Sequence, residues 1–384
     1  MYATTPKTGK RAVFAKPTSI PPLPLPSIKR RTTVIPPKQA PPSIIGFLRK
    51  NAGKDLSTVS MPVTANEPTS ALQRVAENME YSHLLDSAAS SSLTPAERLL
   101  HIAAFALSTL SANRVKERAL RKPFNPMLGE TFELVREDLG FRFVAEKISH
   151  HPVRMACQAE SLTNGGWSFA QAPQPTQKFW GKSVELNTEG EKYVEPVHNL
   201  TIIEESGELR AVCTFKAGGM FSGRSEDVTL QLLDRDGTVL PLGLTGKWTE
   251  SLIRTDINKP IWTAGALVPD SAKHFGFTAF AATLNEITEN ESGFLAPTDS
   301  RLRPDQRAYE HGNVDDAEAM KAKLEERQRS RRKVLEGHGK QWEPRFFERV
   351  DGAGEETWRL KEKGGYWDRR MKGDWNGVEE VFEL

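Results

Sequence analysis

The 384-residue chain lacks the features that mark membrane-spanning, secreted and disulfide-rich proteins. No stretch approaches the roughly 18 consecutive apolar residues that a membrane-spanning helix needs. The N-terminal residues MYATTPKTGKR contain no apolar segment of the kind that a secretory signal requires. Only two cysteines are present, Cys157 and Cys213, and their spacing fits neither a disulfide framework nor a zinc or redox motif. We therefore expect a protein of the reduced cytoplasm.

Acidic residues are absent from the first 54 positions, which hold eleven lysines and arginines. The other 330 residues carry 41 basic and 50 acidic side chains, so positive charge is concentrated at the N-terminus. Ten prolines also precede residue 43, and proline interrupts both helices and central strands. We predict a disordered basic arm over residues 1–42. Such an arm suits an anionic membrane surface, although a solvated linker would have the same composition.

The signatures of common enzymes are also missing. Gly181-Lys182-Ser183 resembles the end of a phosphate-binding loop, but Thr176 stands where the first glycine is required. The chain contains no HExxH, no GxSxG and no GxGxxG that opens a helix after a strand. The residues therefore predict no metal centre and no known catalytic site, and a hydrolase is only a distant alternative.

Helical patterns lie on both sides of a strand-rich middle. Ser70 with Gln73, and Thr94 with Glu97, form capping boxes that predict two helix starts. Residues 315–336 are rich in helix formers, with acids first and bases last, and predict a long charged helix. The tryptophan-rich end of the chain indicates a packed final subdomain.

From about residue 130, apolar and polar side chains alternate with the period of two that is typical of strands. Asp236-Gly237 predicts a hairpin turn. Consecutive strands without helices between them predict a large antiparallel sheet, which curls or closes into a barrel able to enclose a ligand. Further strands are expected around residues 153–161, 166–171, 178–186, 198–204 and 208–216.

Three groups of polar residues are candidates for anion binding. In EKISHHPV, His150 and His151 would point to opposite faces of an extended chain, so they suit phosphate oxygens better than a shared metal ion. In KPFNPMLGE, Lys122 and Asn125 lie on a rigid two-proline loop. Lys321, Glu325 and Arg329 recur every four residues on one face of the charged helix. Ordinary hydrogen-bonded histidines, a structural turn and a solvated helix face would explain the three groups as well.

Two of these motifs carry a family resemblance. EKISHHPV resembles EQVSHHPP, the signature of the oxysterol-binding protein family, and KPFNPMLGE resembles the family's KPLNPxLGE. The resemblance extends from about residue 42 to the C-terminus and includes EERQR in the charged helix. It implies an α+β fold, in which a large incomplete antiparallel β-barrel encloses a hydrophobic lipid tunnel. The implied segments are a lid region at 43–67, N-terminal helices at 68–120, the barrel at 121–285 and a C-terminal helical subdomain at 286–384.

The resemblance implies a lipid-binding and lipid-transfer protein without enzymatic activity, cofactor, metal or nucleic-acid partner. Such a protein extracts phosphatidylinositol 4-phosphate, and works at the surface of anionic membranes, at contact sites with the endoplasmic reticulum. The acyl chains of the lipid would fill the tunnel, and burial of each CH₂ group there contributes about 0.8 kcal/mol to binding. The headgroup-binding residues that the motifs imply are Lys122, Asn125, His150, His151, Lys321, Glu325 and Arg329.

One departure from the family pattern concerns a second ligand. Relatives that carry sterol or phosphatidylserine have a bulky apolar stretch after the lid, whereas this chain has Thr64, Ala65 and Asn66 there. We therefore favour the phosphoinositide as ligand. Exchange of the phosphoinositide for a sterol or phosphatidylserine is the first alternative, and a regulatory tether that presents the bound lipid to a partner enzyme is the second.

Overall fold

The computed structural model describes most of the chain between residues 28 and 384. The described ranges are 28–42, 61–150, 152–162, 166–180, 183–189, 198–204, 206–216, 225–339, 342–350 and 357–384, without the side chains of 174–189, 198 and 199. Residues 43–60 of the predicted lid region, the first 27 residues of the predicted arm and His151 lie outside these ranges.

Residues 28–42 pack against the folded domain, so the prediction of a disordered arm is wrong for this stretch. Val34 is buried in an apolar cluster with Phe275 and Tyr309. The guanidinium of Arg31 pairs with Glu310 at 2.6 Å. Composition predicted disorder because it does not reveal such specific contacts with distant parts of the chain.

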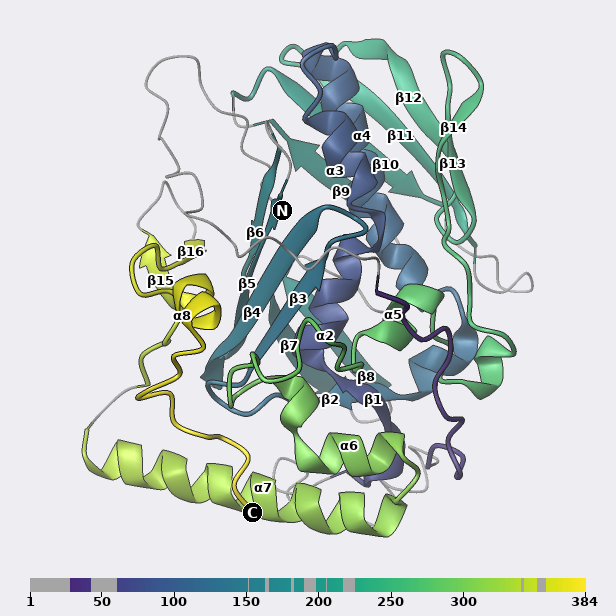
Figure 1. Ribbon diagram of the computed structural model, residues 1–384. Coiled ribbons are helices and arrows are strands. Elements are labelled where there is room, and N and C mark those ends of the chain that lie inside the picture. Colours follow the sequence, from purple (N-terminus) through teal and green to yellow (C-terminus); the bar gives the residue numbers. More distant parts are fainter. Residues whose placement is uncertain are drawn as a thin grey trace.

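The N-terminal helices begin where the capping boxes predict. Ser70 caps α2 (Ala71–Ala76), and its side chain and that of Gln73 accept each other's backbone N–H groups. Thr94 and Glu97 form the same box at α4 (Pro95–Ser108), after the short α3 (His83–Ala88). Helix α4 packs its apolar stripe against β10, β12 and β14 of a large sheet (Figure 1).

The middle of the chain forms antiparallel sheets, which confirms the predicted fold class (Figure 1). A four-stranded sheet comprises β3 (Thr131–Arg136), β4 (Phe141–His150), β5 (Val153–Ser161) and β6 (Ser168–Gln171). A six-stranded sheet comprises β9 (His198–Ile203), β10 (Leu209–Phe215), β11 (Asp227–Asp234), β12 (Val239–Lys247), β13 (Ser251–Arg254) and β14 (Lys259–Thr263). The hairpin β7 (Gln174–Trp180) and β8 (Ser183–Glu189) follows β6 in the chain.

The hairpins test two sequence predictions. Gly237 adopts a φ of +86° between β11 and β12, which confirms the predicted turn. The single strand predicted over 178–186 is wrong, because the chain reverses there and Trp180 pairs with Ser183. Apolar and polar residues alternate along both strands of a tight hairpin, so the alternation does not reveal where the chain reverses direction.

Strand β4 is buried on both faces. Phe143 and Ala145 face the interior core with α4, whereas Val144 and Ile148 contact Phe346 and other residues of the C-terminal subdomain. Strand β4 therefore lies between the apolar core that contains α4 and a second apolar cluster formed with the C-terminal subdomain.

The described C-terminal part contains four further α-helices and a small sheet: α5 (Ala279–Thr283), α6 (Pro304–Glu310), α7 (Val314–Gly337), β15 (Phe347–Val350), β16 (Thr357–Leu360) and α8 (Tyr366–Lys372). Helix α7 confirms the predicted charged helix. Phe346, Tyr366 and Trp375 form edge-on and tilted aromatic contacts, so the tryptophan-rich end packs a subdomain against β4 and β5. Within the described residues no helix has the length and apolar character needed to cross a membrane.

Short elements complete the described chain. Strand β1 (Asn66–Ser70) pairs in parallel with β2 (Lys122–Phe124). The 3₁₀ helices are η1 (Val63–Ala65), η2 (Glu77–Tyr81), η3 (Thr109–Asn113), η4 (Lys116–Leu120), η5 (Ser271–Lys273) and η6 (Ser300–Leu302).

Candidate functional site

The KPFNPMLGE segment begins in β2 and ends at the start of β3. Asn66 of β1 donates its side-chain amide to the carbonyl oxygens of Lys122 and Pro123, at 3.3 and 3.2 Å. Asn66, which the sequence marked as a departure, therefore anchors this segment. The Lys122 side chain is half-buried, and burial lowers the pKa of its ammonium. A cation that is partly desolvated in this way favours an anionic partner.

Asn125 connects this segment to two cations. Its side-chain oxygen accepts a hydrogen bond from Nζ of Lys147 at 3.0 Å, and its backbone carbonyl accepts one from Arg303 at 2.8 Å. The residue is itself exposed. Asn125 therefore lies between solvent and two buried positive charges.

Arg303 forms the centre of a buried charge network below the segment. Its guanidinium pairs with Asp305 at 2.8 Å and with Glu130 at 3.2 Å. Burial raises the pKa of Glu130, which the charge of Arg303 opposes. This network holds the end of KPFNPMLGE in place, because Glu130 also accepts the backbone N–H of Met127 at 2.8 Å.

Lys147 is the functional candidate that motif reasoning missed. It lies on the inward face of β4, in the row of Phe143 and Ala145, and its side chain is completely buried. Burial lowers the pKa of its ammonium to about 8, and the charge of Arg303 adds to this effect while Glu130 opposes it. The signal was present in EKISHHPV, where Lys147 replaces the glutamine of the family signature.

His150 lies at the end of β4 and reaches helix α7. The amide nitrogen of Gln328 is 3.1 Å from Nδ1 and 3.3 Å from Nε2 of the imidazole, so the two side chains are in contact. Gln328 belongs to EERQR and was not among the predicted ligands. The predicted partner of His150, His151, lies outside the described residues.

Helix α7 brings two of its three predicted residues together. The ammonium of Lys321 pairs with Glu325 at 2.7 Å and donates to the backbone carbonyl of Met61 at 2.9 Å. Arg329 is exposed and pairs with Glu326 at 2.8 Å. The described structure thus joins Lys321 to Glu325 and directs Arg329 to a different partner.

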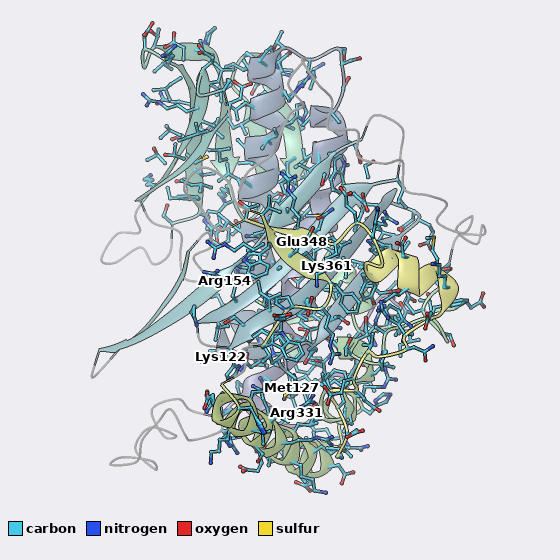
Figure 2. All side chains as sticks on the ribbon, turned by 90° about the vertical axis from the view of Figure 1, so that its left-hand side faces the viewer. Lys122, Met127, Arg154, Arg331, Glu348 and Lys361 are labelled. Atoms are coloured by element: carbon cyan, nitrogen blue, oxygen red, sulfur yellow. The ribbon has the colours of Figure 1, made fainter. Side chains whose placement is uncertain are left out.

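Helix α7 contacts both segments that carry the signature motifs. Leu324 of α7 packs on Met127 in a small apolar cluster. Figure 2 shows Lys122 and Met127 on the side of the fold that faces α7, beside the labelled Arg331 of that helix. Together with the His150 contact, this packing places both signature motifs against one helix.

The site is suited to binding an anion. Lys122, Lys147, His150 and Lys321 supply nitrogen donors from three segments, and charge-assisted hydrogen bonds from such donors to phosphate are short and strong. Among the described residues, no three His, Cys, Asp or Glu side chains lie where they would hold one metal ion. The interior behind the site is lined by phenylalanine, leucine and alanine side chains of the sheets and α4.

Comparisons with known proteins agree with the motifs. The model of a family described as "Oxysterol-binding protein" matches residues 43–194 and 189–371. An oxysterol-binding protein homologue of Schizosaccharomyces pombe is 44% identical over 95% of this chain and 42% of its own length. Oxysterol-binding protein homolog 3 of Saccharomyces cerevisiae is 43% identical over 93% of this chain and 37% of its own length. The chain thus spans about two fifths of these curated relatives.

Solved structures resemble the fold over nearly the whole chain. The crystal structure of the Osh3 ORD from Saccharomyces cerevisiae in complex with PI(4)P is 43% identical, with a TM-score of 0.81, and covers 93% of this chain and 100% of that chain. The Osh1 ORD domain in complex with cholesterol is 28% identical, with a TM-score of 0.77, over 92% of this chain and 95% of that chain.

Proposed function

The chain belongs to the oxysterol-binding protein family, and we propose that it extracts phosphatidylinositol 4-phosphate from membranes and carries it with the headgroup bound where helix α7 meets the two signature motifs. The observation that supports this proposal is that both signature motifs meet helix α7, which carries Lys321: His150 contacts Gln328, and Met127 packs on Leu324. The Osh3 ORD, a 43% identical relative, was crystallised with PI(4)P.

The physical balance supports binding of a whole lipid. A phosphomonoester carries close to two negative charges at neutral pH, and buried or half-buried cations compensate them better than water-exposed ones. Acyl chains lose contact with the bilayer on extraction, so an apolar interior is needed to offset about 0.8 kcal/mol per CH₂. We therefore propose binding and transfer as the activity, in place of catalysis, by a protein that acts peripherally at membranes.

The test is extraction from liposomes that contain either phosphatidylinositol 4-phosphate or phosphatidylinositol. After the liposomes are refloated, mass spectrometry identifies the lipid that remains with the protein. We expect about one phosphoinositide per protein, and a reduction in affinity of about 10- to 100-fold for Lys122→Ala, since a charged hydrogen bond contributes about 1.5–3 kcal/mol. Lys259→Ala, at an exposed position of β14, is the matched control. Equal extraction of phosphatidylinositol would contradict the headgroup assignment.

A second assay distinguishes transfer of the lipid between membranes from presentation of the bound lipid to a partner. Donor liposomes with a fluorescent phosphoinositide are mixed with acceptor liposomes at a protein concentration far below that of the lipid. A carrier moves many lipids per protein, whereas a protein that only presents the lipid to a partner binds one and releases it slowly.

A sterol is the second candidate ligand, because the similar Osh1 ORD domain was crystallised with cholesterol and with ergosterol. Exchange of sterol for phosphoinositide would require both lipids to compete for the same interior. Fluorescent sterol is therefore offered to the loaded protein. Displacement of the phosphoinositide by sterol favours the exchanger, and loading of phosphoinositide alone favours the single-ligand carrier.

A further inference from the structure

The backbone of Lys147 is hydrogen-bonded to the last two residues of the KPFNPMLGE segment. Its N–H donates to the carbonyl of Glu130 at 2.9 Å, and its own carbonyl accepts the N–H of Gly129 at 3.0 Å. The side chain extends inward from β4 to Asn125. Its ammonium is thus fixed beneath a residue that is exposed at the candidate headgroup site.

The charge of this ammonium is poorly compensated by the protein. In the described structure Nζ of Lys147 donates one hydrogen bond, to the neutral side-chain oxygen of Asn125, although an ammonium has three donors. The carboxylate of Glu130 is already bonded to Arg303, to the Ser300 hydroxyl at 2.6 Å and to the Met127 N–H. A completely buried cation in this situation is costly, and an anion beside it would remove much of that cost.

We propose that Lys147 is an additional ligand of the phosphomonoester that this site binds, reached together with Asn125. The inference rests on the proposed function, because it assigns one more positive charge to the same headgroup. Glutamine at this position in the family signature offers hydrogen bonds without charge. The lysine of this chain would therefore increase the preference for a phosphorylated headgroup over an unphosphorylated one.

The proposal has a characteristic pH dependence. Burial lowers the pKa of Lys147 to about 8 in the free protein, and a bound phosphate would raise it. Binding above pH 8 then requires uptake of a proton, so affinity falls as pH rises through 8, by up to about tenfold per pH unit. Glu130 and Arg303 are the charged groups that face this ammonium, and the phosphate itself titrates near 6, below this window.

The test compares wild type, Lys147→Gln and Lys147→Arg, with Lys259→Gln as a control that removes one exposed charge far from the site. Affinity is measured for liposomes with phosphatidylinositol 4-phosphate and with phosphatidylinositol, at pH 7.0, 8.0 and 9.0. We expect Lys147→Gln to bind the phosphorylated lipid about 10- to 100-fold more weakly, to bind phosphatidylinositol as wild type does, and to lose most of the decline between pH 8 and 9. Lys147→Arg should retain the preference for the phosphorylated lipid and lose the pH dependence, because arginine does not titrate.

Three outcomes separate the inference from its premise. If wild type extracts no phosphoinositide, the proposed function fails. If wild type extracts it and Lys147→Gln does so with the same affinity and pH profile, Lys147 has only a structural role and the inference is overturned. Titration with inorganic phosphate distinguishes a site for free phosphate from a site for the lipid headgroup. If Lys147→Gln loses binding of inorganic phosphate but binds the lipid as wild type does, the assignment of Lys147 to the lipid is also overturned. Thermal unfolding of the lipid-free variants shows whether each is folded.

Discussion

Replacement of Arg303 by methionine tests how the buried charge network supports the site. The guanidinium is 1% exposed and is bonded to two carboxylates that are fully buried, Glu130 and Asp305. It also donates to the carbonyl of Asn125 and lies 5.1 Å from the ring centre of Phe124. Methionine has a similar length but carries no charge, so it leaves both carboxylates buried without their main partner.

The expected loss of stability follows from these contacts. Breaking a buried ion pair by removing one partner costs about 3–5 kcal/mol. Burial already raises the pKa of Glu130, and loss of Arg303 would raise it further. When a carboxyl must be protonated in the folded state, the free energy of unfolding falls by about 1.4 kcal/mol for each pH unit above the usual pKa of that carboxyl. The destabilisation of Arg303→Met is therefore expected to be larger at pH 8 than at pH 5.5.

Urea unfolding of wild type and Arg303→Met at both pH values measures this difference. We expect the change in the free energy of unfolding to be about 3–5 kcal/mol at pH 8, and smaller by at least about 1 kcal/mol at pH 5.5. Arg235→Met is the control, because Arg235 forms an exposed pair with Glu208 that should contribute below about 1 kcal/mol. Equal destabilisation at the two pH values would refute the reasoning, since the two carboxylates would then not be responsible.

Three further predictions concern stability. Gly129 has a φ of +81° and an added Cβ would meet the Trp342 ring at 2.6 Å, so Gly129→Ala should lower the free energy of unfolding by about 2–4 kcal/mol in urea titrations; a loss below about 1 kcal/mol would contradict the contact. Burial raises the pKa of Glu146 to about 7, so the folded state binds more protons than the unfolded state between pH 4.5 and 7 and this residue lowers stability as pH rises through that range. Glu146→Gln should make the pH profile of wild type less steep, and an unchanged profile would count against it. Thr94→Ala should cost about 0.5–2 kcal/mol through loss of the α4 cap. Thr238→Ala in a turn should cost less, because the hydrogen bonds between Thr238 and Asp234 use the backbone of Thr238, which alanine keeps.

Local signals in the sequence predicted the elements that depend on nearby residues. The Ser70 and Thr94 caps and the Gly237 turn each depend on contacts within a few residues, so their spacing is visible in the sequence. Arg31 and Glu310 are 279 residues apart, and no local pattern shows that they meet. Composition therefore predicted disorder for residues 28–42, which instead pack against the folded domain.

The candidate site shows the same division. The motifs located Lys122, Asn125 and His150 because each lies in a short segment with a family likeness. Arg303 was missed because its partner Glu130 is 173 residues away in the chain. Lys147 was visible as a substitution, but its importance depends on burial, which only the packing of β4 reveals.

The position of Lys321 links the proposed headgroup site to the segment that precedes β1. Its ammonium pairs with Glu325 and donates to the backbone carbonyl of Met61, and its side chain is 8% exposed. A phosphate that engages this ammonium therefore acts on the same side chain that fixes the chain at Met61. Nearby, Glu318 of the same helix accepts the backbone N–H of Val63. Helix α7 thus contacts this segment at two points, Met61 and Val63. We therefore expect anion binding to be coupled energetically to the position of residues 61–63. The coupling depends on how differently the anion-free and anion-bound protein hold Lys321.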